Sequence, residues 1–201
     1  MADGELVLYG ETLWISPYVF SSFVALCEKG VAFRVEEIDL IHLAHRSGAY
    51  RDDSLTAKVP ALRHGEFVLA ESSAIAEYIE DTHPTPSLRP ADPKERARMR
   101  VIFNIADQYL LAPLFELFDQ VDTKVRNAKV VDEQLTELTK ALSGLNHFLS
   151  GGKYALGANA SLADCALVPS LFYVNAIGPM FGQPDIMAAT PKVKAYFASL
   201  Q

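Results

Sequence analysis

The first segment whose residue types suggest chemistry is Ser16-Pro17-Tyr18-Val19, between a short apolar run and an apolar helical stretch. Proline suits the first position of a helix, so Ser16 is a natural N-cap. A hydroxyl there lies at the positive end of the helix dipole, among amides that have no partner inside the helix. Such a position stabilises an anion, including a thiolate that a ligand supplies. The alternative, from this segment alone, is that Ser16 only caps the helix.

A second segment, Lys58-Val59-Pro60, stands where a polar loop enters an expected strand. Proline lacks an amide hydrogen, so it is confined to the start or the edge of a strand. If the Val59–Pro60 peptide is cis, the Val59 N–H and C=O turn outward and can pair with a peptide-like ligand. Only about 5–6% of X–Pro bonds in folded proteins are cis, so a trans proline that opens the strand is the simpler expectation.

The third segment, Glu71-Ser72-Ser73, directly precedes an amphipathic stretch around Ile75. Ser72 is a candidate N-cap, and the start of the helix offers free amides to a carboxylate. Glu71 is placed to receive an ammonium group, so the pair matches the two charges of an amino acid. The alternative is a capped surface helix with an exposed glutamate.

A fourth segment, Ser161-Leu162-Ala163-Asp164, is a capping box with Asp in place of Glu. It indicates the start of a helix, so its role is structural.

The elements that must position these segments change in character near residue 84. Before it, we expect strands and helices in the order β-α-β, a polar loop, then β-β-α, with His64-Gly65 as a two-residue hairpin turn. The expected elements are Leu6–Tyr9, Pro17–Lys29, Phe33–Leu40, Val59–Arg63, Glu66–Ala70 and Ser72–Asp81. A parallel unit followed by a hairpin and a helix implies a small mixed sheet covered by helices.

A proline-rich stretch separates this part from the rest of the chain. Pro84, Pro86, Pro90 and Pro93 leave too few amide donors for a helix, which predicts a linker at 84–93. Every later periodic stretch is helical. These stretches are 94–120, with a kink or break at Pro113, and 130–149, 162–177 and 192–200. We therefore predict an α/β domain at 1–83 and an all-α domain at 94–201.

Composition narrows the class of protein. The chain has 201 residues and a net charge of −7, and its basic residues are scattered apart from Arg96, Arg98 and Arg100, which disfavours nucleic acid as a partner. No run approaches the about 20 uninterrupted apolar residues of a membrane span, and the acidic N-terminus is unlike a signal peptide. Cys27 and Cys165 have no metal-ligand spacing and are expected to be buried thiols in a reducing compartment. We expect a cytoplasmic protein without a metal.

Taken together, the segments resemble the cytosolic glutathione transferase family across nearly the whole chain. A strand followed by Ser16-Pro17-Tyr18-Val19 is similar to the serine-type active sites of tau- and theta-like members. The run 16–22 followed by 25–30 especially resembles bacterial members. Lys58-Val59-Pro60-Ala61-Leu62 resembles the cis-proline motif of the family, and the run from Glu71 to Ile79 its glutamyl-binding segment. The resemblance implies an N-terminal thioredoxin-like domain, followed by a C-terminal all-helical domain.

The resemblance also implies a role for each matching residue. Ser16 would be catalytic, donating its hydroxyl to the glutathione sulfur and favouring the thiolate, whose pKa in a free thiol is about 8.5. The Val59 backbone, beside Pro60, would pair with the cysteinyl portion. Glu71 and Ser72 would hold the γ-glutamyl end. Lys58 would meet the glycine carboxylate, with His42 or His45 from the polar loop as further candidates.

The family resemblance carries expectations about substrates and assembly too. Glutathione would be the co-substrate, small hydrophobic electrophiles the second substrate, and a homodimer the assembly, with glutathione-dependent peroxidase activity as an added possibility. The helical domain would supply the co-substrate site, with Tyr109, Leu110, Phe115 and Phe172 as candidates, although aromatics at helical spacing are more often core.

Of four alternatives to a serine-type transferase, two stay open at this point: an activating tyrosine and a non-catalytic protein. Disulfide exchange in the manner of thioredoxin needs a cysteine where this chain has Ser16, so that route is excluded. The zeta branch, which includes isomerases, carries a Ser-Ser-Cys run that is absent here. Tyr9 or Tyr18 is an alternative activating group, although Tyr9 lies in an expected strand. A non-catalytic binding or adaptor protein on the same scaffold is the alternative function.

Overall fold

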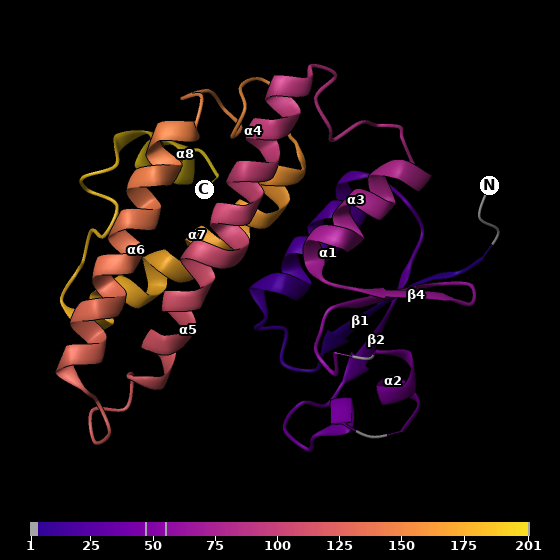
Figure 1. Cartoon of the computed structure of the whole chain (residues 1–201), viewed down its shortest axis with the longest axis horizontal. Coiled ribbons are helices and arrows are strands. Elements are labelled where there is room, and N and C mark those ends of the chain that lie inside the picture. The colour runs from indigo at the N-terminus through magenta and orange to yellow at the C-terminus, as the bar shows by residue number, and fades with distance from the viewer. Residues whose placement is uncertain (1–3, 47, 55, 201) are drawn as a thin grey trace. The chain divides into compact units, whose positions relative to one another are not determined.

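The computed structural model describes residues 4–46, 48–54 and 56–200, and the chain forms two compact units, Met1–Leu88 and Arg89–Gln201 (Figure 1). The first unit contains a sheet with helices, and the second is helical. The division falls within the proline-rich segment 84–93. The fold class predicted from the sequence is therefore confirmed.

The first unit is built on a four-stranded mixed sheet of order β2-β1-β3-β4. Strand β1 pairs in parallel with β2 and antiparallel with β3, which pairs antiparallel with β4. The elements are β1 (Leu6–Glu11), α1 (Pro17–Glu28), β2 (Arg34–Ile38), η1 (Ala44–Arg46), α2 (Gly48–Asp53), β3 (Ala61–His64), β4 (Phe67–Ala70) and α3 (Ser72–Thr82). The predicted β-α-β and β-β-α order is confirmed, and the polar loop contains two short helices.

Helix α1 lies close against the sheet because its apolar face meets β1. Leu8 of β1, Leu26 of α1 and Ile75 of α3 are fully buried in one cluster. Gly10 allows the approach, since a Cβ on it would lie only 3.0 Å from a methyl carbon of Val19. The start of α1 is thereby fixed against the end of β1, which matters for the segment between them.

Two local predictions in this unit were wrong. The hairpin turn is Gly65-Glu66 rather than His64-Gly65, because His64 pairs with Phe67 in the ladder. Gly65 has a φ of +61°, the conformation that a tight hairpin turn demands and that glycine adopts without strain. Cys27 is exposed rather than buried, and of the two thiols only that of Cys165 is buried. Cys27 lies off the face of α1 that packs on the sheet.

The second unit consists of packed helices joined by loops (Figure 1). They are α4 (Pro93–Asn104), η2 (Ile105–Leu110), α5 (Leu111–Asp119), α6 (Ala128–Phe148), α7 (Leu162–Ile177), η3 (Gly178–Phe181) and α8 (Pro191–Ala198). The break predicted at Pro113 occurs one turn earlier, as the π-helical segment η2. Proline cannot donate to the carbonyl four residues before it, here that of Tyr109, so the hydrogen-bond ladder is disturbed there.

Asp164 ties three parts of the helical unit together. It is the third residue of α7, and the predicted capping box is confirmed by Ser161 at the N-cap. Its Oδ2 accepts from the amide and the hydroxyl of Ser161, each at 2.9 Å, and its Oδ1 accepts from the amide of Ala155 and the hydroxyl of Tyr196, each at 2.8 Å. Burial and the Asp164 carboxylate both raise the pKa of Tyr196, so its hydroxyl stays a donor.

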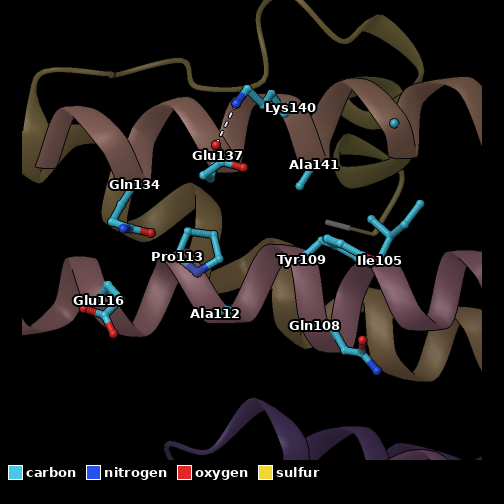
Figure 2. A pocket seen from close by; sticks show the side chains of 11 residues that line it. Ile105, Gln108, Tyr109, Ala112, Pro113, Glu116, Gln134, Glu137, Lys140 and Ala141 are labelled. Carbon is cyan, nitrogen blue, oxygen red and sulfur yellow. Dashed lines mark hydrogen bonds and ion pairs between the residues drawn. The ribbon is translucent and has the colours of Figure 1, made fainter. Parts of the chain in front are cut away.

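A groove of about 510 Å³ runs between α6 and the continuous rod of η2 and α5 (Figure 2). Its lining is Ile105, Gln108, Tyr109, Ala112, Pro113, Glu116, Gln134, Glu137, Lys140, Ala141 and Gly144. Lys140 is engaged by Glu137 at 2.6 Å, from Nζ to Oε1. The lining therefore combines apolar side chains with carboxylate, amide and ammonium groups.

Two stretches of the helical unit, Pro93–Asp119 and Leu162–Phe181, are long and apolar enough to match membrane spans by length and composition. Half of the most apolar window of the first and 67% of that of the second are buried inside the protein. Burial of this kind is also found in the core helices of proteins that do not span a membrane.

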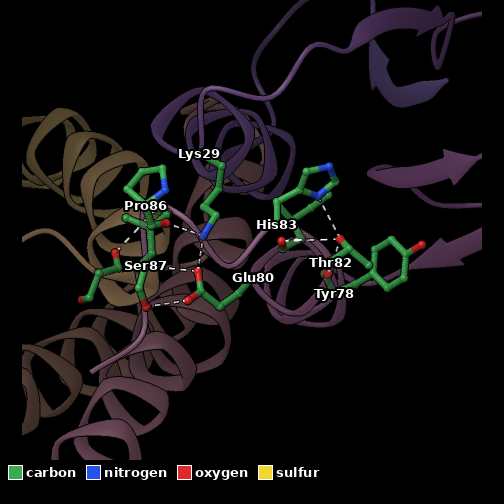
Figure 3. Close-up of polar contacts among 11 residues, drawn as sticks. Lys29, Tyr78, Glu80, Thr82, His83, Pro86 and Ser87 are labelled. Atoms are coloured by element: carbon green, nitrogen blue, oxygen red, sulfur yellow. Dashed lines mark hydrogen bonds and ion pairs between the residues drawn. The ribbon is translucent and has the colours of Figure 1, made fainter. Parts of the chain in front are cut away.

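A buried ion pair fastens the last residues of the first unit onto its helices (Figure 3). Lys29 follows α1, and its Nζ lies 2.7 Å from Oε2 of Glu80 on α3, with side chains 0% and 4% exposed. Glu80 also accepts from the hydroxyl of Ser87 at 2.8 Å and the amide of Leu88 at 3.0 Å. Lys29 donates in addition to the carbonyl of Pro86. Both charged groups thus have hydrogen-bond partners within the unit, as burial requires.

His83, the C-cap of α3, should make the first unit less stable in acid. Burial, followed by the positive groups of His64 and Lys29, lowers its pKa below the ordinary value of 6.5. The unfolded chain then binds more protons than the folded chain once the pH falls below about 6.5, so the free energy of unfolding decreases there. We expect His83→Gln to weaken this loss between pH 8 and pH 5, measured by urea unfolding. At pH 8 His83 is neutral in both the folded and the unfolded chain. The difference in unfolding free energy between the variant and the wild-type protein at that pH therefore reports packing alone. An equal pH dependence in both proteins would contradict the assignment.

Candidate functional site

The register of the sheet brings the predicted site segments to one end. Tyr9 of β1 pairs with Ala61 of β3, and Ala61 pairs with Ala70 of β4, so these three residues form one rung. Ser16 follows the end of β1, the Val59–Pro60 peptide precedes the start of β3, and Glu71 follows the end of β4. Because the strands run antiparallel in this pattern, segments distant in the sequence meet at the same edge of the sheet.

Ser16 is the N-cap of α1, as predicted. Its Oγ accepts a hydrogen bond from the amide of Val19 at 3.3 Å, and Pro17 opens the helix. Ser16 is half-buried, within reach of both protein and solvent. A serine hydroxyl has two acceptor lone pairs and one donor hydrogen. Since the Val19 amide uses acceptor capacity, the hydrogen of the hydroxyl is left to donate elsewhere.

The Val59–Pro60 peptide bond is cis, as the family resemblance implies. Pro60 is buried, Val59 is half-buried and Lys58 is exposed. Val59 lies before the first residue of the ladder formed by β3, Ala61, so its backbone is outside the sheet. The segment therefore presents backbone polar groups and a cationic side chain at the edge where Ser16 lies.

The Glu71-Ser72 segment has a different capping arrangement from the predicted one. The N-cap of α3 is Glu71, with φ 73° and ψ 120° and no side-chain cap bond, whereas Ser72 is the first helical residue and is buried. A positive φ is rare for a residue other than glycine, and such outliers cluster at ligand sites. Here it turns the chain sharply from β4 into the helix and leaves the Glu71 side chain exposed.

Two helix N-termini consequently lie at one end of the sheet. Helix α1 begins beyond β1 and helix α3 begins directly after β4. Each start presents amides without intrahelical partners and about half a positive elementary charge. The two helix starts favour an anion and Lys58 adds a formal positive charge, although the net charge of the chain is −7 and the carboxylates of Glu11 and Glu71 lie at the same edge.

The remaining predicted candidates are not equally well placed. His42 is 81% exposed, and its Nδ1 lies 2.6 Å from Oδ2 of Asp39. His45 lies on η1, where its Nε2 accepts from Nε of Arg46 at 3.2 Å. Tyr9 is in the core, with its hydroxyl accepting from Nε of Arg63 at 2.9 Å, which disfavours it as an activating group. Tyr18 is half-buried on α1.

Two buried side chains that the sequence did not single out hold the backbone of this site. Glu11 accepts from the amides of Ile15 and Ser16. Tyr50 of α2 donates its hydroxyl to the carbonyl of Lys58. Burial raises the pKa of Tyr50, which keeps that hydroxyl protonated. Neither residue belongs to a motif or to a periodic pattern, so only the folded loops reveal these contacts.

The helical unit joins two of the predicted co-substrate residues through a chain of rings. Phe115 of α5 lies 6.2 Å from Phe118, Phe118 lies 6.0 Å from Tyr173 of α7, and Tyr173 lies 5.5 Å from Phe172, measured between ring centroids. Phe115 and Phe172 are both exposed. Among the described residues, no group of three or more His, Cys, Asp and Glu side chains is arranged to hold a metal ion.

Comparison with known proteins covers both units. Residues 15–82 match the N-terminal domain of glutathione S-transferases, and residues 128–199 match the C-terminal domain. Glutathione S-transferase 3 of Zea mays is 30% identical over 204 residues, covering 97% of this chain and 88% of that protein. Maleylacetoacetate isomerase of Mus musculus is 31% identical over 175 residues, covering 85% and 79%.

Solved structures agree over nearly the full length. Glutathione S-transferase I bound with lactoylglutathione superposes with a TM-score of 0.77 and 28% identity, covering 98% of this chain and 93% of that chain. The holo structure of maleyl pyruvate isomerase, a bacterial zeta-class glutathione S-transferase, gives a TM-score of 0.79 and 27% identity, covering 96% and 91%. With both domains matched in order, this chain belongs to the glutathione transferase family.

Proposed function

We propose that this protein is a glutathione transferase in which Ser16 favours the thiolate of bound glutathione for attack on an electrophile. Glutathione is the co-substrate of the family. The observation that carries the proposal is the position of Ser16: a hydroxyl at the N-terminus of α1, at the sheet edge shared by the Val59–Pro60 and Glu71-Ser72 segments.

The chemistry follows from the hydrogen bonds of Ser16. Its Oγ accepts from the Val19 amide, so its hydrogen is available to the glutathione sulfur. A donor to the charged form lowers the pKa of a thiol, and one pH unit corresponds to about 1.4 kcal/mol. The thiol loses its proton to solvent, and the thiolate then forms a carbon–sulfur bond with the electrophile. Either a leaving group departs with the electron pair of its bond to that carbon, or an activated double bond opens and its other end takes up a proton from solvent. Positioning of the two reactants and stabilisation of the thiolate supply the acceleration.

The tripeptide would be held along the same edge of the sheet. The backbone of Val59, beside Pro60, would pair with the cysteinyl portion, and Lys58 would meet the glycine carboxylate. The γ-glutamyl end would lie at the start of α3, where Ser72 and the helix amides receive its carboxylate and Glu71 receives its ammonium. These assignments give each charged end group of the ligand either a side chain of opposite charge or a set of hydrogen-bond donors.

The helical unit would provide the apolar surface for a small hydrophobic electrophile. The chain of rings from Phe115 to Phe172 supports this assignment, because two exposed aromatic faces backed by two further rings suit a planar or apolar substrate. We further propose a cytoplasmic homodimer, as the family resemblance implies, and peroxide reduction as a side activity of the same thiolate.

A glutathione-dependent isomerase is the second candidate. It is favoured by the relatives named maleylacetoacetate isomerases, at 30–31% identity over 85% of this chain. Against it stands the local sequence Ser16-Pro17-Tyr18-Val19, which lacks the Ser-Ser-Cys run of the zeta branch. A cis–trans isomerisation assay with maleylacetoacetate, run beside conjugation assays, separates the two activities.

Removal of the Ser16 hydroxyl should impair ionisation of glutathione more than its binding. We expect Ser16→Ala to raise the pH midpoint of thiolate absorbance by about one unit or more, and to reduce kcat/KM at pH 7 by about 10- to 100-fold. The measurement is a glutathione titration followed in the ultraviolet against pH, with conjugation rates in parallel. Ser16→Thr keeps the hydroxyl and should retain most of the ionisation.

Ser143→Ala, an exposed change on α6, is the matched control and should leave both quantities at the wild-type values. If the wild-type protein binds glutathione without lowering its thiol pKa, a binding or adaptor function replaces the transferase. Failure to bind glutathione at all would leave only the family fold.

A further inference from the structure

Glu11 is a buried carboxylate at the start of the loop that carries Ser16. It is the last residue of β1 and is only 2% exposed. Its Oε1 lies 2.6 Å from the amide nitrogen of Ser16 and also accepts from the amide of Ile15. Its backbone carbonyl accepts from the amide of Trp14 at 3.2 Å. Three consecutive amides of the loop, those of residues 14, 15 and 16, therefore donate to one residue.

The loop has few other means of holding its shape. Leu13 and Ile15 are 54% and 57% exposed, so neither side chain anchors it in the core. The other printed attachments of the loop lie earlier in the chain: the amide of Thr12 donates to the carbonyl of Ile38 at 3.3 Å, and Nε1 of Trp14 donates to Oε1 of Glu37 at 3.0 Å. The indole ring of Trp14 also lies 5.3 Å from that of Phe23, while the Trp14 backbone adopts a positive φ of 51°. The backbone just before Ser16 thus depends on the Glu11 carboxylate, since these attachments act two or more residues earlier.

The second carboxylate oxygen distinguishes this arrangement from ordinary loop packing. Glu11 Oε2 is buried and has no hydrogen-bond partner among the described residues. A buried oxygen without a partner destabilises the fold, so an apolar side chain would fill this space with a smaller loss of stability. The two hydrogen bonds that the carboxylate accepts come from the backbone at and next to the candidate catalytic serine, which suggests that this position is what the unpaired oxygen supports.

We propose that Glu11 is a positioning residue for Ser16, fixing the N-cap of α1 so that the serine hydroxyl is held in place for the glutathione sulfur. The inference rests on the proposed function. Glu11 acts through the backbone and does not touch the substrate. Its contribution is geometric, and its negative charge works against a neighbouring thiolate. A variant that keeps the acceptor oxygen and removes the charge separates the positioning of Ser16 from the repulsion of the thiolate.

The test compares Glu11→Met with Glu11→Gln. Methionine fills a similar volume without an acceptor oxygen, whereas glutamine keeps one oxygen for the two amides and carries no charge. We expect Glu11→Met to raise the pH midpoint of bound glutathione by about one unit and lower kcat/KM at pH 7 by about 10-fold, with glutathione affinity changed less than about 3-fold. Glu11→Gln should ionise glutathione at or below the wild-type midpoint.

Hydrogen exchange of the Ile15 and Ser16 amides, measured by NMR without ligand, reports their hydrogen bonds to Glu11 independently of catalysis. Protection should fall at least about 10-fold in Glu11→Met and stay within about 3-fold of wild type in Glu11→Gln. Glu80→Gln is the matched control, a buried glutamate of the same unit that does not touch this loop. It should lower stability and leave the thiol midpoint unchanged.

The outcomes separate the inference from the proposed function. If wild type ionises glutathione and Glu11→Met does so at the same pH, the positioning role is wrong although the transferase stands. If Glu80→Gln shifts the midpoint as far as Glu11→Met does, the effect is general destabilisation and the inference also fails. If wild-type protein does not ionise glutathione, the proposed function fails, and the positioning role fails with it whatever the amide exchange shows.

Discussion

Replacement of Lys29 by methionine is expected to lower the free energy of unfolding of the first unit by about 3–5 kcal/mol. Methionine matches much of the lysine stem but leaves the Glu80 carboxylate buried at 4% exposure without its cation. Glu80 keeps the Ser87 hydroxyl and the Leu88 amide, which do not compensate a full charge. Urea unfolding followed by circular dichroism and by the fluorescence of Trp14 measures the loss.

The double variant Lys29→Met/Glu80→Gln is the control. Glutamine can still accept from Ser87 or Leu88 and carries no charge, so the double variant should be more stable than Lys29→Met alone. Replacement of both partners of a buried pair is often nearly neutral, whereas removal of one partner is not. A double variant that is no more stable than the single one would show that packing, and not the isolated charge, causes the loss.

Asp164→Ala is expected to destabilise the helical unit by about 3–5 kcal/mol, because four donors lose their acceptor at once. The amides of Ser161 and Ala155 and the hydroxyls of Ser161 and Tyr196 all converge on this carboxylate, which is buried. Each donor left without a partner in the interior carries its own desolvation penalty. Thermal and denaturant unfolding of the purified variant test the expectation.

Tyr196→Phe isolates one of these four bonds and should cost only about 1–2 kcal/mol. The loss of unfolding free energy in Asp164→Asn should lie between those of the other two variants, because an amide offers one acceptor oxygen where the carboxylate offers two. If Asp164→Ala loses no more than Tyr196→Phe, the other three donors must find water, and the network is not the anchor of the start of α7.

Helix boundaries were predictable where a capping signal coincided with a change in pattern. Helix α7 runs from Leu162 to Ile177 as predicted, because the Ser161-to-Asp164 signal marks its start locally. The hairpin was misplaced by one residue because the pattern fixes the strands but not which residues the turn uses. The pairing of His64 with Phe67 in the ladder settles it in the structure. The π-helical turn at η2 left no sequence signal other than Pro113, several residues away.

The local structure of two candidate site segments was predictable because each segment is short. The capping role of Ser16 and the position of Val59–Pro60 before a strand depend on immediate neighbours in the chain. The contacts of Glu11 and Tyr50 depend on how loops fold back on themselves. Glu11 contacts amides four and five residues later, and Tyr50 contacts a carbonyl eight residues later. No periodicity in the sequence encodes these contacts. Cys27 was wrongly expected in the core, although the spacing of buried Ser22, Ala25 and Leu26 already places it on another face.

The exposure of Cys27 gives the protein a single natural attachment point for a reporter group. The chain has two cysteines, and the other, Cys165, is buried with its Sγ directed to the carbonyl of Ser161. Partial burial and the neighbouring Glu28 raise the pKa of the Cys27 thiol, so labelling proceeds faster in mildly alkaline buffer. A fluorophore or spin label there sits on the helix that Ser16 caps, eleven positions away from the serine. Motion of that helix on ligand binding thus becomes observable without introducing a new cysteine.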